Sequence, residues 1–273
     1  MGKNRVTMIL RLVRGLILSV GLAVGSFWVP RAHAHGDMHL QITEVTKQID
    51  QAPKKAELYL RRGDLYRVHR DWDSAQADYD RAQAQDPRLP GLDFARGSLF
   101  LEAGWFQSAK VALDRFLAQS TNHVEALAAR ARTLVKLDQL APAARDYGRA
   151  IAFSSEPRPD LYIERAQALS ASEPPALAEA LQGLQEGIQK LGPLITLQLY
   201  AIDLEIKLKR VDGALARLDQ VMAQSPRKEA WLARRGEILQ EAGRAEEAKE
   251  ALAAALKAIA SLPPARRDRK SVV

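Results

Sequence analysis

Histidines are the side chains of this 273-residue chain best suited to metal chemistry, and three of its five, His33, His35 and His39, stand close together near the N-terminus. His35 and His39 are four residues apart, with Asp37 between them. If the chain is cut before His35, that residue offers both an α-amine and an imidazole, a chelate suited to copper(II) or nickel(II), and His39 can add a ligand. The spacing indicates a candidate metal site at His35 and His39; the alternative is a flexible polar leader that binds nothing.

Motifs for catalysis are missing from the sequence. The chain has no cysteine, which excludes disulfides, thiolate nucleophiles, iron–sulfur clusters and cysteine-ligated zinc. It has no G-x-S-x-G, no H-E-x-x-H and no glycine-rich phosphate loop. His69 and His123 fall in expected turns and are interpreted as solvated loop residues. We therefore predict a non-catalytic chain with no cofactor, apart from copper or nickel at the leader.

The net charge of +7 resides in the two ends of the chain. Residues 1–34 hold five basic and no acidic residues, and residues 265–273 hold four basic residues and one acidic residue. The body between them is therefore close to neutral. Nucleic-acid binding requires clustered basic charge on the fold itself, so no nucleic-acid partner is expected, and an RNA-binding helical array is disfavoured.

The N-terminus has the three parts of a secretory signal peptide. A basic segment (1–14) precedes an uncharged apolar run of 15 residues (15–29), and Ala32-His33-Ala34 is a small-x-small cleavage site. Fifteen helical residues span roughly 22 Å, short of the roughly 30 Å hydrocarbon core of a membrane. Cleavage between Ala34 and His35 predicts a periplasmic or secreted protein. The alternative is an uncleaved inner-membrane anchor that leaves the chain facing the periplasm.

The body of the chain repeats every 34 residues. Small residues recur at Gly63, Gly97 and Ala131, and the same register aligns two further columns, Ala75/Ala109/Ala143 and Tyr79/Leu113/Tyr147. The register slips by a few residues near the Ser172–Pro175 turn and then resumes. Self-similarity at this period is typical of repeat architectures, and it predicts six units.

Each unit is predicted to be a pair of helices. In the first, apolar residues recur at three-to-four-residue spacing on either side of a turn, Asp71 can cap the second helix and Pro87 follows its end. Two antiparallel helices approach most closely where neither side chain is large. This explains why small residues recur at Gly63, Gly97 and Ala131, here called the small column. One hairpin leaves an apolar face open that only a neighbouring hairpin can cover, so the units must stack.

These residues resemble the tetratricopeptide repeat family. The first unit matches the family pattern at Tyr59, Gly63, Tyr66, Ala75, Tyr79, Ala82 and Pro87, and departs from it at Arg62, where leucine is usual. The resemblance implies an all-α fold, a right-handed α-solenoid of about six helix-turn-helix repeats. Residues 38–51, with Ile42, Val45 and Ile49 at helical spacing, are expected to form an N-terminal capping helix.

The predicted organisation has four parts: a signal peptide at 1–34, a histidine-containing leader with the cap helix at 35–55, the solenoid at 56–260 and a basic tail at 261–273. The repeats are expected at about 56–89, 90–123, 124–158, 159–193, 195–228 and 229–260. The tail is interpreted as a solvated end; the alternative is a contact with anionic lipid headgroups.

The resemblance also implies a partner-binding groove along the concave face of the first helices. The positions carried over are Leu60, Asp64, Arg67, Phe94, Ser98, Leu101, Ala128, Arg132, Val135, Ile163 and Gln167. Their mixed apolar and charged character suits an extended peptide or a partner helix. Family members that grip the C-terminal carboxylate of heat-shock chaperones use Lys and Asn here; Leu60, Asp64, Ser98 and Ala128 do not match, so that function is not expected.

We therefore predict a non-catalytic periplasmic scaffold or adaptor that binds an unidentified protein or peptide of the cell envelope in this groove. Membrane contact is expected only through the signal segment or the basic tail. The alternative function is a metal-handling accessory protein that binds copper or nickel at His35 and His39.

Overall fold

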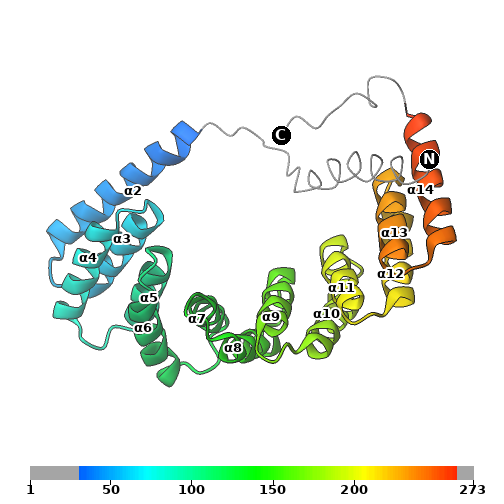
Figure 1. Cartoon of the computed structure of the whole chain (residues 1–273). Helices are drawn as coiled ribbons and strands as arrows, with labels where there is room; N and C mark the ends of the chain where they lie inside the picture. The colour runs from blue at the N-terminus through cyan, green and yellow to red at the C-terminus, as the bar shows by residue number, and fades with distance from the viewer. Residues whose placement is uncertain (1–30, 263–273) are drawn as a thin grey trace. The chain divides into compact units, whose positions relative to one another are not determined.

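The computed structural model describes residues 31–262, with side chains from Met38 onward. Over this range the chain forms thirteen α-helices and no strand (Figure 1). None of these helices is long and apolar enough to span a bilayer. The predictions for the signal segment at 1–30 and for the tail at 263–273 lie outside the described residues.

The described residues form two compact units, 31–183 and 184–262, with the boundary inside helix α10. The amino-terminal unit contains α2 (Arg31–Gln51), α3 (Ala56–Val68), α4 (Trp72–Gln85), α5 (Leu92–Glu102), α6 (Phe106–Gln119), α7 (Val124–Lys136), α8 (Leu140–Phe153), α9 (Pro159–Ala171) and the first part of α10 (Leu177–Leu191). The carboxyl-terminal unit contains the rest of α10, then α11 (Ile195–Lys207), α12 (Val211–Gln224), α13 (Glu229–Glu241) and α14 (Ala245–Ala260).

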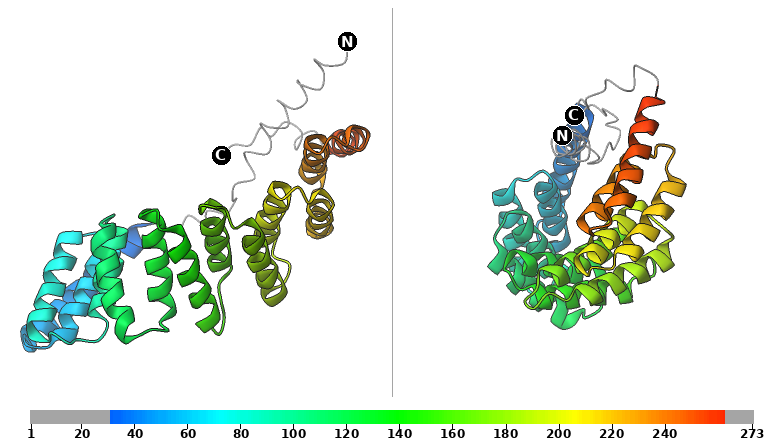
Figure 2. Two further views of the ribbon diagram at one scale, coloured as in Figure 1. Left: turned by 60° about the horizontal axis from the view of Figure 1, so that its bottom comes forward. Right: turned by 45° about the vertical axis from the view of Figure 1, so that its right-hand side comes forward.

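Consecutive helices form hairpins that repeat with the predicted period, as the neighbouring helices of the amino-terminal unit show in the left view of Figure 2. A Cβ atom on Gly63 would lie 2.5 Å from the Tyr79 ring, and one on Gly97 would lie 2.5 Å from Leu113 Cγ. Ala131, one further period along, is completely buried. The small column therefore marks the close approach of the two helices in successive hairpins, and the all-α repeat fold is confirmed.

The turns inside the hairpins show the same period. Residues at equivalent positions adopt positive φ: Arg70, Gly104 and Asp138 in the first three hairpins, then Lys209 and Gly243 in the last two. The next residue donates its N–H to the carbonyl five positions back in each of these turns, for example Trp105 to Phe100 at 2.7 Å. This left-handed closure satisfies carbonyls at the end of the first helix.

The fourth hairpin departs from this turn. Ala143 and Ala180 are 37 residues apart, three more than one period. Here the Ala176 N–H closes the turn on the Leu169 carbonyl at 2.9 Å, and the Ser172 hydroxyl donates to the same carbonyl at 2.8 Å. The widened turn at 172–176 thus absorbs most of the slip, and the loop before α9 absorbs the rest.

Helix α2 covers the open face of the first hairpin, as the capping prediction requires. Val45 and Ile49 are buried, and the Arg62 guanidinium of α3 donates to the Thr46 hydroxyl at 3.0 Å. The helix extends further than the predicted 38–51, because it already begins at Arg31. The predicted cleavage site between Ala34 and His35 therefore lies in the first turns of α2.

An arginine precedes the small residue of the first helix in the first three hairpins, where it ties helices together. Arg62 binds Asp78 of its own hairpin at 2.6 Å, and Arg96 binds Asp80 of the preceding hairpin at 2.5 Å. Arg130 does both, donating to Asp146 at 2.7 Å and to Asp114 at 2.9 Å. These pairs add directional contacts between hairpins that apolar burial alone does not provide.

Candidate functional site

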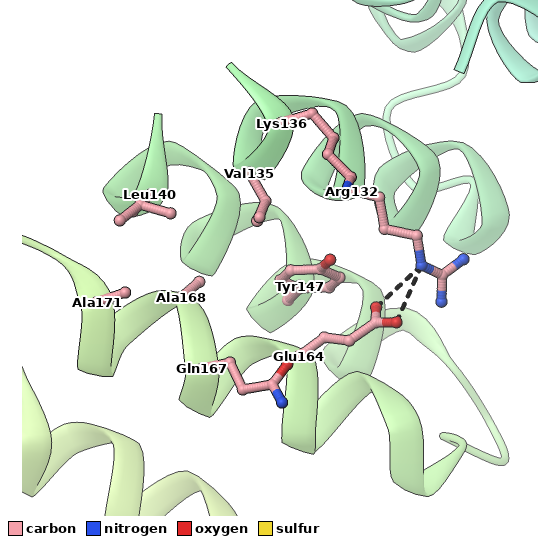
Figure 3. Close-up of a pocket in the computed structure, with 9 residues that line it drawn as sticks. All are labelled: Arg132, Val135, Lys136, Leu140, Tyr147, Glu164, Gln167, Ala168 and Ala171. Atoms are coloured by element: carbon pink, nitrogen blue, oxygen red, sulfur yellow. Dashed lines mark hydrogen bonds and ion pairs between the residues drawn. The ribbon is translucent and has the colours of Figure 1, made fainter. Parts of the chain in front are cut away.

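A pocket of about 310 Å³ opens where α7, α8 and α9 meet in the amino-terminal unit (Figure 3). Its apolar wall comes from all three helices, with Val135 on α7, Leu140 and Tyr147 on α8, and Ala168 and Ala171 on α9. The remaining lining residues are polar: Arg132, Lys136, Glu164 and Gln167. Three of the predicted groove residues, Arg132, Val135 and Gln167, therefore line one pocket.

An ion pair forms one side of this pocket. The Arg132 Nε donates to both carboxylate oxygens of Glu164, at 3.1 and 3.0 Å, and its Nη2 donates to Asp160 at 3.2 Å. Burial alone would lower the pKa of the Arg132 guanidinium, but the bonds to Glu164 outweigh that effect and the pKa is raised. Arg132 is therefore a fixed, neutralised part of the wall (Figure 3).

Tyr147 forms the floor of the pocket and is only 2% exposed. Burial, together with the neighbouring Glu164 carboxylate to which its hydroxyl is hydrogen-bonded, raises the pKa of Tyr147 above its usual value. The phenol therefore stays neutral at physiological pH. A neutral ring beside an internally compensated ion pair favours an apolar group as the occupant.

Lys136 supplies the pocket's uncompensated charge. Within residues 38–262 its ammonium has no carboxylate partner, whereas both acids facing Arg132 are engaged. The side chain is exposed at the end of α7. The pocket thus combines an apolar cavity with one free cation at its edge.

The predicted residues of the first hairpin are arranged in a related way but form no described pocket. Arg67 of α3 is paired with Glu102 of α5, and Asp64 accepts a hydrogen bond from the Tyr79 hydroxyl at 2.8 Å. Burial is the main cause of the raised pKa of Tyr79, and the Asp64 carboxylate raises it further. Like Arg132, Arg67 is occupied in linking successive first helices.

Phe94, Ser98 and Ala128 are turned to packing rather than to a groove surface. The Phe94 ring lies 5.4 Å from the Phe116 ring and 5.0 Å from the His123 ring, measured between centres. The Ser98 hydroxyl donates to the Phe94 carbonyl at 2.9 Å, and Ala128 is only 3% exposed. Ala128 therefore offers little surface to a partner, whereas Phe94 and Ser98 are half-buried and their part in binding stays a prediction. Leu60, Leu101 and Ile163 are half-buried, and their part in binding stays a prediction.

Six residues of the pocket are absent from the sequence prediction: Lys136, Leu140, Tyr147, Glu164, Ala168 and Ala171. Glu164 carried a readable signal, because it follows Arg132 by 32 residues, close to one period, as Glu102 follows Arg67 by 35. Opposite charges one repeat apart on first helices indicate a contact between neighbouring repeats. Tyr147 had been assigned only to the core column.

The candidate metal ligands are placed only in part. His39 lies on α2, whereas the side chain of His35 is outside the described residues. Among the described side chains, no cluster of three or more His, Asp or Glu residues is arranged to hold a metal ion. His123 precedes α7 with 37% of its side chain exposed, but it is also engaged: its Nδ1 accepts the Ala126 N–H and its ring packs on Phe116.

The repeat geometry agrees with comparisons to known proteins. A family model described as tetratricopeptide repeat matches residues 205–267. The C-terminal part of a TPR repeat-containing protein from Cytophaga hutchinsonii has a similar structure, with a TM-score of 0.68 at 14% sequence identity over 85% of this chain and 92% of that chain. Residues 205–267 thus match the tetratricopeptide repeat (TPR) family model, and the described residues have the fold of TPR proteins. No curated protein matches this sequence.

Two further solved structures share the fold. YrrB, described as a TPR protein with an unusual peptide-binding site, has a TM-score of 0.57 at 20% identity, covering 69% of this chain and 95% of YrrB. MamA has a TM-score of 0.57 at 18% identity, covering 64% of this chain and 94% of MamA. At these identities the likeness concerns the fold. The TPR fold is that of protein–protein interaction scaffolds.

Proposed function

We propose that this TPR chain is a non-catalytic adaptor that holds a segment of a protein partner against the pocket formed by α7, α8 and α9. The observation that carries the proposal is the pocket itself, whose apolar lining comes from three consecutive helices. Its volume of about 310 Å³ lies at the lower end of the range for ligand sites, a size suited to one or two side chains rather than to a cofactor.

The chemistry of the pocket specifies the partner segment. An apolar side chain fits against Val135, Leu140 and Tyr147, since the nearby Arg132–Glu164 pair is already neutralised. A carboxylate placed a few ångströms away can pair with Lys136. The expected partner is therefore a peptide with a large apolar residue next to an acidic residue. The peptide-binding site named for YrrB, a protein of the same fold, is consistent with this mode of binding.

A peptide selection tests the proposal. A library of linear peptides is screened on the full chain, and the affinities of the selected peptides are measured by calorimetry. We expect binders that carry an apolar–acidic pair, and we expect Val135→Asp to weaken them at least about tenfold, because a carboxylate at the rim repels the acidic residue and hydrates the apolar wall.

Val111→Asp is the matched control, because Val111 is an exposed valine on α6 of the same unit, outside the pocket. It should bind the selected peptides like the unmodified chain, and both variants should keep their helical circular dichroism. Equal affinity of the two valine variants would show that binding occurs elsewhere. Failure of the library to yield any binder enriched in the apolar–acidic pair would also contradict the proposal.

We further propose that the chain is exported and acts in the periplasm or outside the cell, on a partner of the cell envelope. The basic segment, apolar run and Ala32-His33-Ala34 site support export. N-terminal sequencing of the chain recovered from its native compartment should begin at His35. A chain that begins at residue 1 and sediments with the inner membrane would support the anchored alternative.

A further inference from the structure

Arg165 precedes the small residue of the fourth hairpin, as Arg130 precedes that of the third, and follows Arg130 by one period and one residue. In the third hairpin two positions supply a carboxylate to this arginine. One is on the second helix of the same hairpin, sixteen residues later, where Asp146 accepts from Arg130 at 2.7 Å. The other is on the preceding second helix, sixteen residues earlier, where Asp114 accepts at 2.9 Å.

Glycine occupies both of these positions in the fourth hairpin. Gly148 stands 34 residues after Asp114. Gly183 stands 37 residues after Asp146, which is one period and the three residues of the slip. A Cβ atom on Gly148 would lie 3.4 Å from the Arg165 Nε, and one on Gly183 would lie 3.0 Å from its Nη1. The guanidinium therefore lies between α8 and α10, without either aspartate.

One ion pair remains on Arg165. Its Nη2 donates to the Glu179 carboxylate of α10 at 2.8 Å, and Glu179 is its only acidic partner within residues 38–262. Its Nε is buried and has no hydrogen-bond acceptor, whereas the Nε of Arg130 is bonded to Asp146. Glu179 is 55% exposed and Arg165 is 22% exposed, so a carboxylate from outside can compete with Glu179 for this cation.

A second cation lies on the same side of α8. Arg145 precedes Gly148 by three residues, a spacing at which two positions share a helix face. Its side chain is exposed and has no acidic partner in the part of the chain that the structure describes. The face of α8 at Gly148 thus presents one free guanidinium beside another that is held by a single exposed acid.

We propose that Arg165 and Arg145 form a docking point for an acidic segment of a partner protein, whose carboxylate binds Arg165 in place of the missing aspartates and displaces Glu179. A carboxylate is favoured over a phosphate, because aspartates bind the equivalent arginines in the first three hairpins. The docking point shares no residue with the α7–α9 pocket and does not depend on peptide binding there.

Fluorescence anisotropy of the full chain with a labelled Glu-rich peptide tests the docking point, and the same peptide with Gln in place of Glu is the uncharged probe. Only the Glu peptide should bind at physiological ionic strength. Arg165→Gln should weaken binding at least about tenfold, because it removes a half-buried cation, and Arg145→Gln should weaken it about threefold. Arg61→Gln is the matched control, because Arg61 is an exposed arginine on α3, and it should bind normally.

Two variants change the competition for Arg165. Gly148→Asp restores the aspartate that Asp114 provides one period earlier, so it should abolish peptide binding and keep the helical circular dichroism and the melting temperature. Glu179→Gln removes the competing carboxylate and should strengthen binding about threefold. Val135→Asp adds a charge in the α7–α9 pocket instead and should bind the Glu peptide normally.

The docking point would be overturned by absence of Glu-peptide binding, by equal binding of the two peptides, or by unchanged affinity in Arg165→Gln or Gly148→Asp. Loss of binding in Val135→Asp but not in Arg165→Gln would also overturn it, because the acidic segment would then bind at the pocket.

Discussion

The third hairpin, in the amino-terminal unit, and the fifth hairpin, in the carboxyl-terminal unit, join their helices with ion pairs of opposite arrangement. In the amino-terminal unit the cation lies on the first helix of the hairpin, where Arg130 is bound to Asp146 on the second helix, with 19% and 7% of the side chains exposed. In the fifth hairpin, within the carboxyl-terminal unit, the equivalent of Arg130 is Ala201. There Arg217 on the second helix binds Glu205 on the first at 2.8 Å, with 15% and 7% exposed.

In these two hairpins a buried ion pair joins the two helices, and either helix can carry the cation. The exposure of the paired carboxylate also differs between hairpins. In the sixth hairpin Arg235 again precedes the small residue, but its partner Asp219 is 53% exposed. Burial, rather than the column in the repeat, should therefore decide how much each pair contributes to stability.

Removal of the buried arginines should give the largest effect. Arg130→Met and Arg217→Met each leave a nearly buried carboxylate without its main partner, and each should lower the free energy of unfolding by about 3 kcal/mol. Arg235→Met leaves the already solvated Asp219 carboxylate unpaired, and it should lower the free energy of unfolding by about 0.5 kcal/mol. Urea unfolding followed by circular dichroism gives the change in the free energy of unfolding for each variant. Amide hydrogen exchange shows which unit loses that stability. Equal losses in all three variants would refute the role of burial.

The position of the small residue also distinguishes the second hairpin from the fifth. Gly97 in the amino-terminal unit touches Leu113, whereas Ile202 occupies the equivalent position in the carboxyl-terminal unit and is 2% exposed. Gly97→Val should destabilise by about 2 kcal/mol, because overpacking outweighs the gain in helix propensity. Ile202→Val removes a buried methylene and should cost about 1 kcal/mol. If Gly97→Val were neutral in thermal unfolding, close approach at this column would not be required.

The fold was predictable from a single sequence because the close packing of paired helices requires small residues at fixed positions. Gly63 and Gly97 are small because Tyr79 and Leu113 lie against them, so the period of 34 residues could be read directly. The positive φ angles of Arg70 and Asp138 could not be predicted, because these residue types do not indicate a left-handed turn as clearly as Gly104 does. The boundary between the two units at residues 183 and 184 also could not be predicted, because the sequence shows only the slip of the period in the fourth repeat.

The candidate site was predictable only in outline. Helical position indicates which residues face inward, but the neighbouring repeat decides which of them remain available. Arg67 forms an ion pair with Glu102, and Arg132 forms one with Glu164. The Phe94 ring packs against Phe116 and His123. The ring contact between His39 on α2 and His69 at the end of α3, whose centres lie 5.1 Å apart, depends on how α2 packs, which no local spacing records.

Amide hydrogen exchange of the full chain with and without a selected peptide tests the central claim most directly. The α7–α9 pocket predicts slower exchange in the facing segments 132–140 and 164–171, with α11 to α14 unchanged. Protection confined to the carboxyl-terminal unit, or the same protection in Val135→Asp as in the unmodified chain, would contradict it.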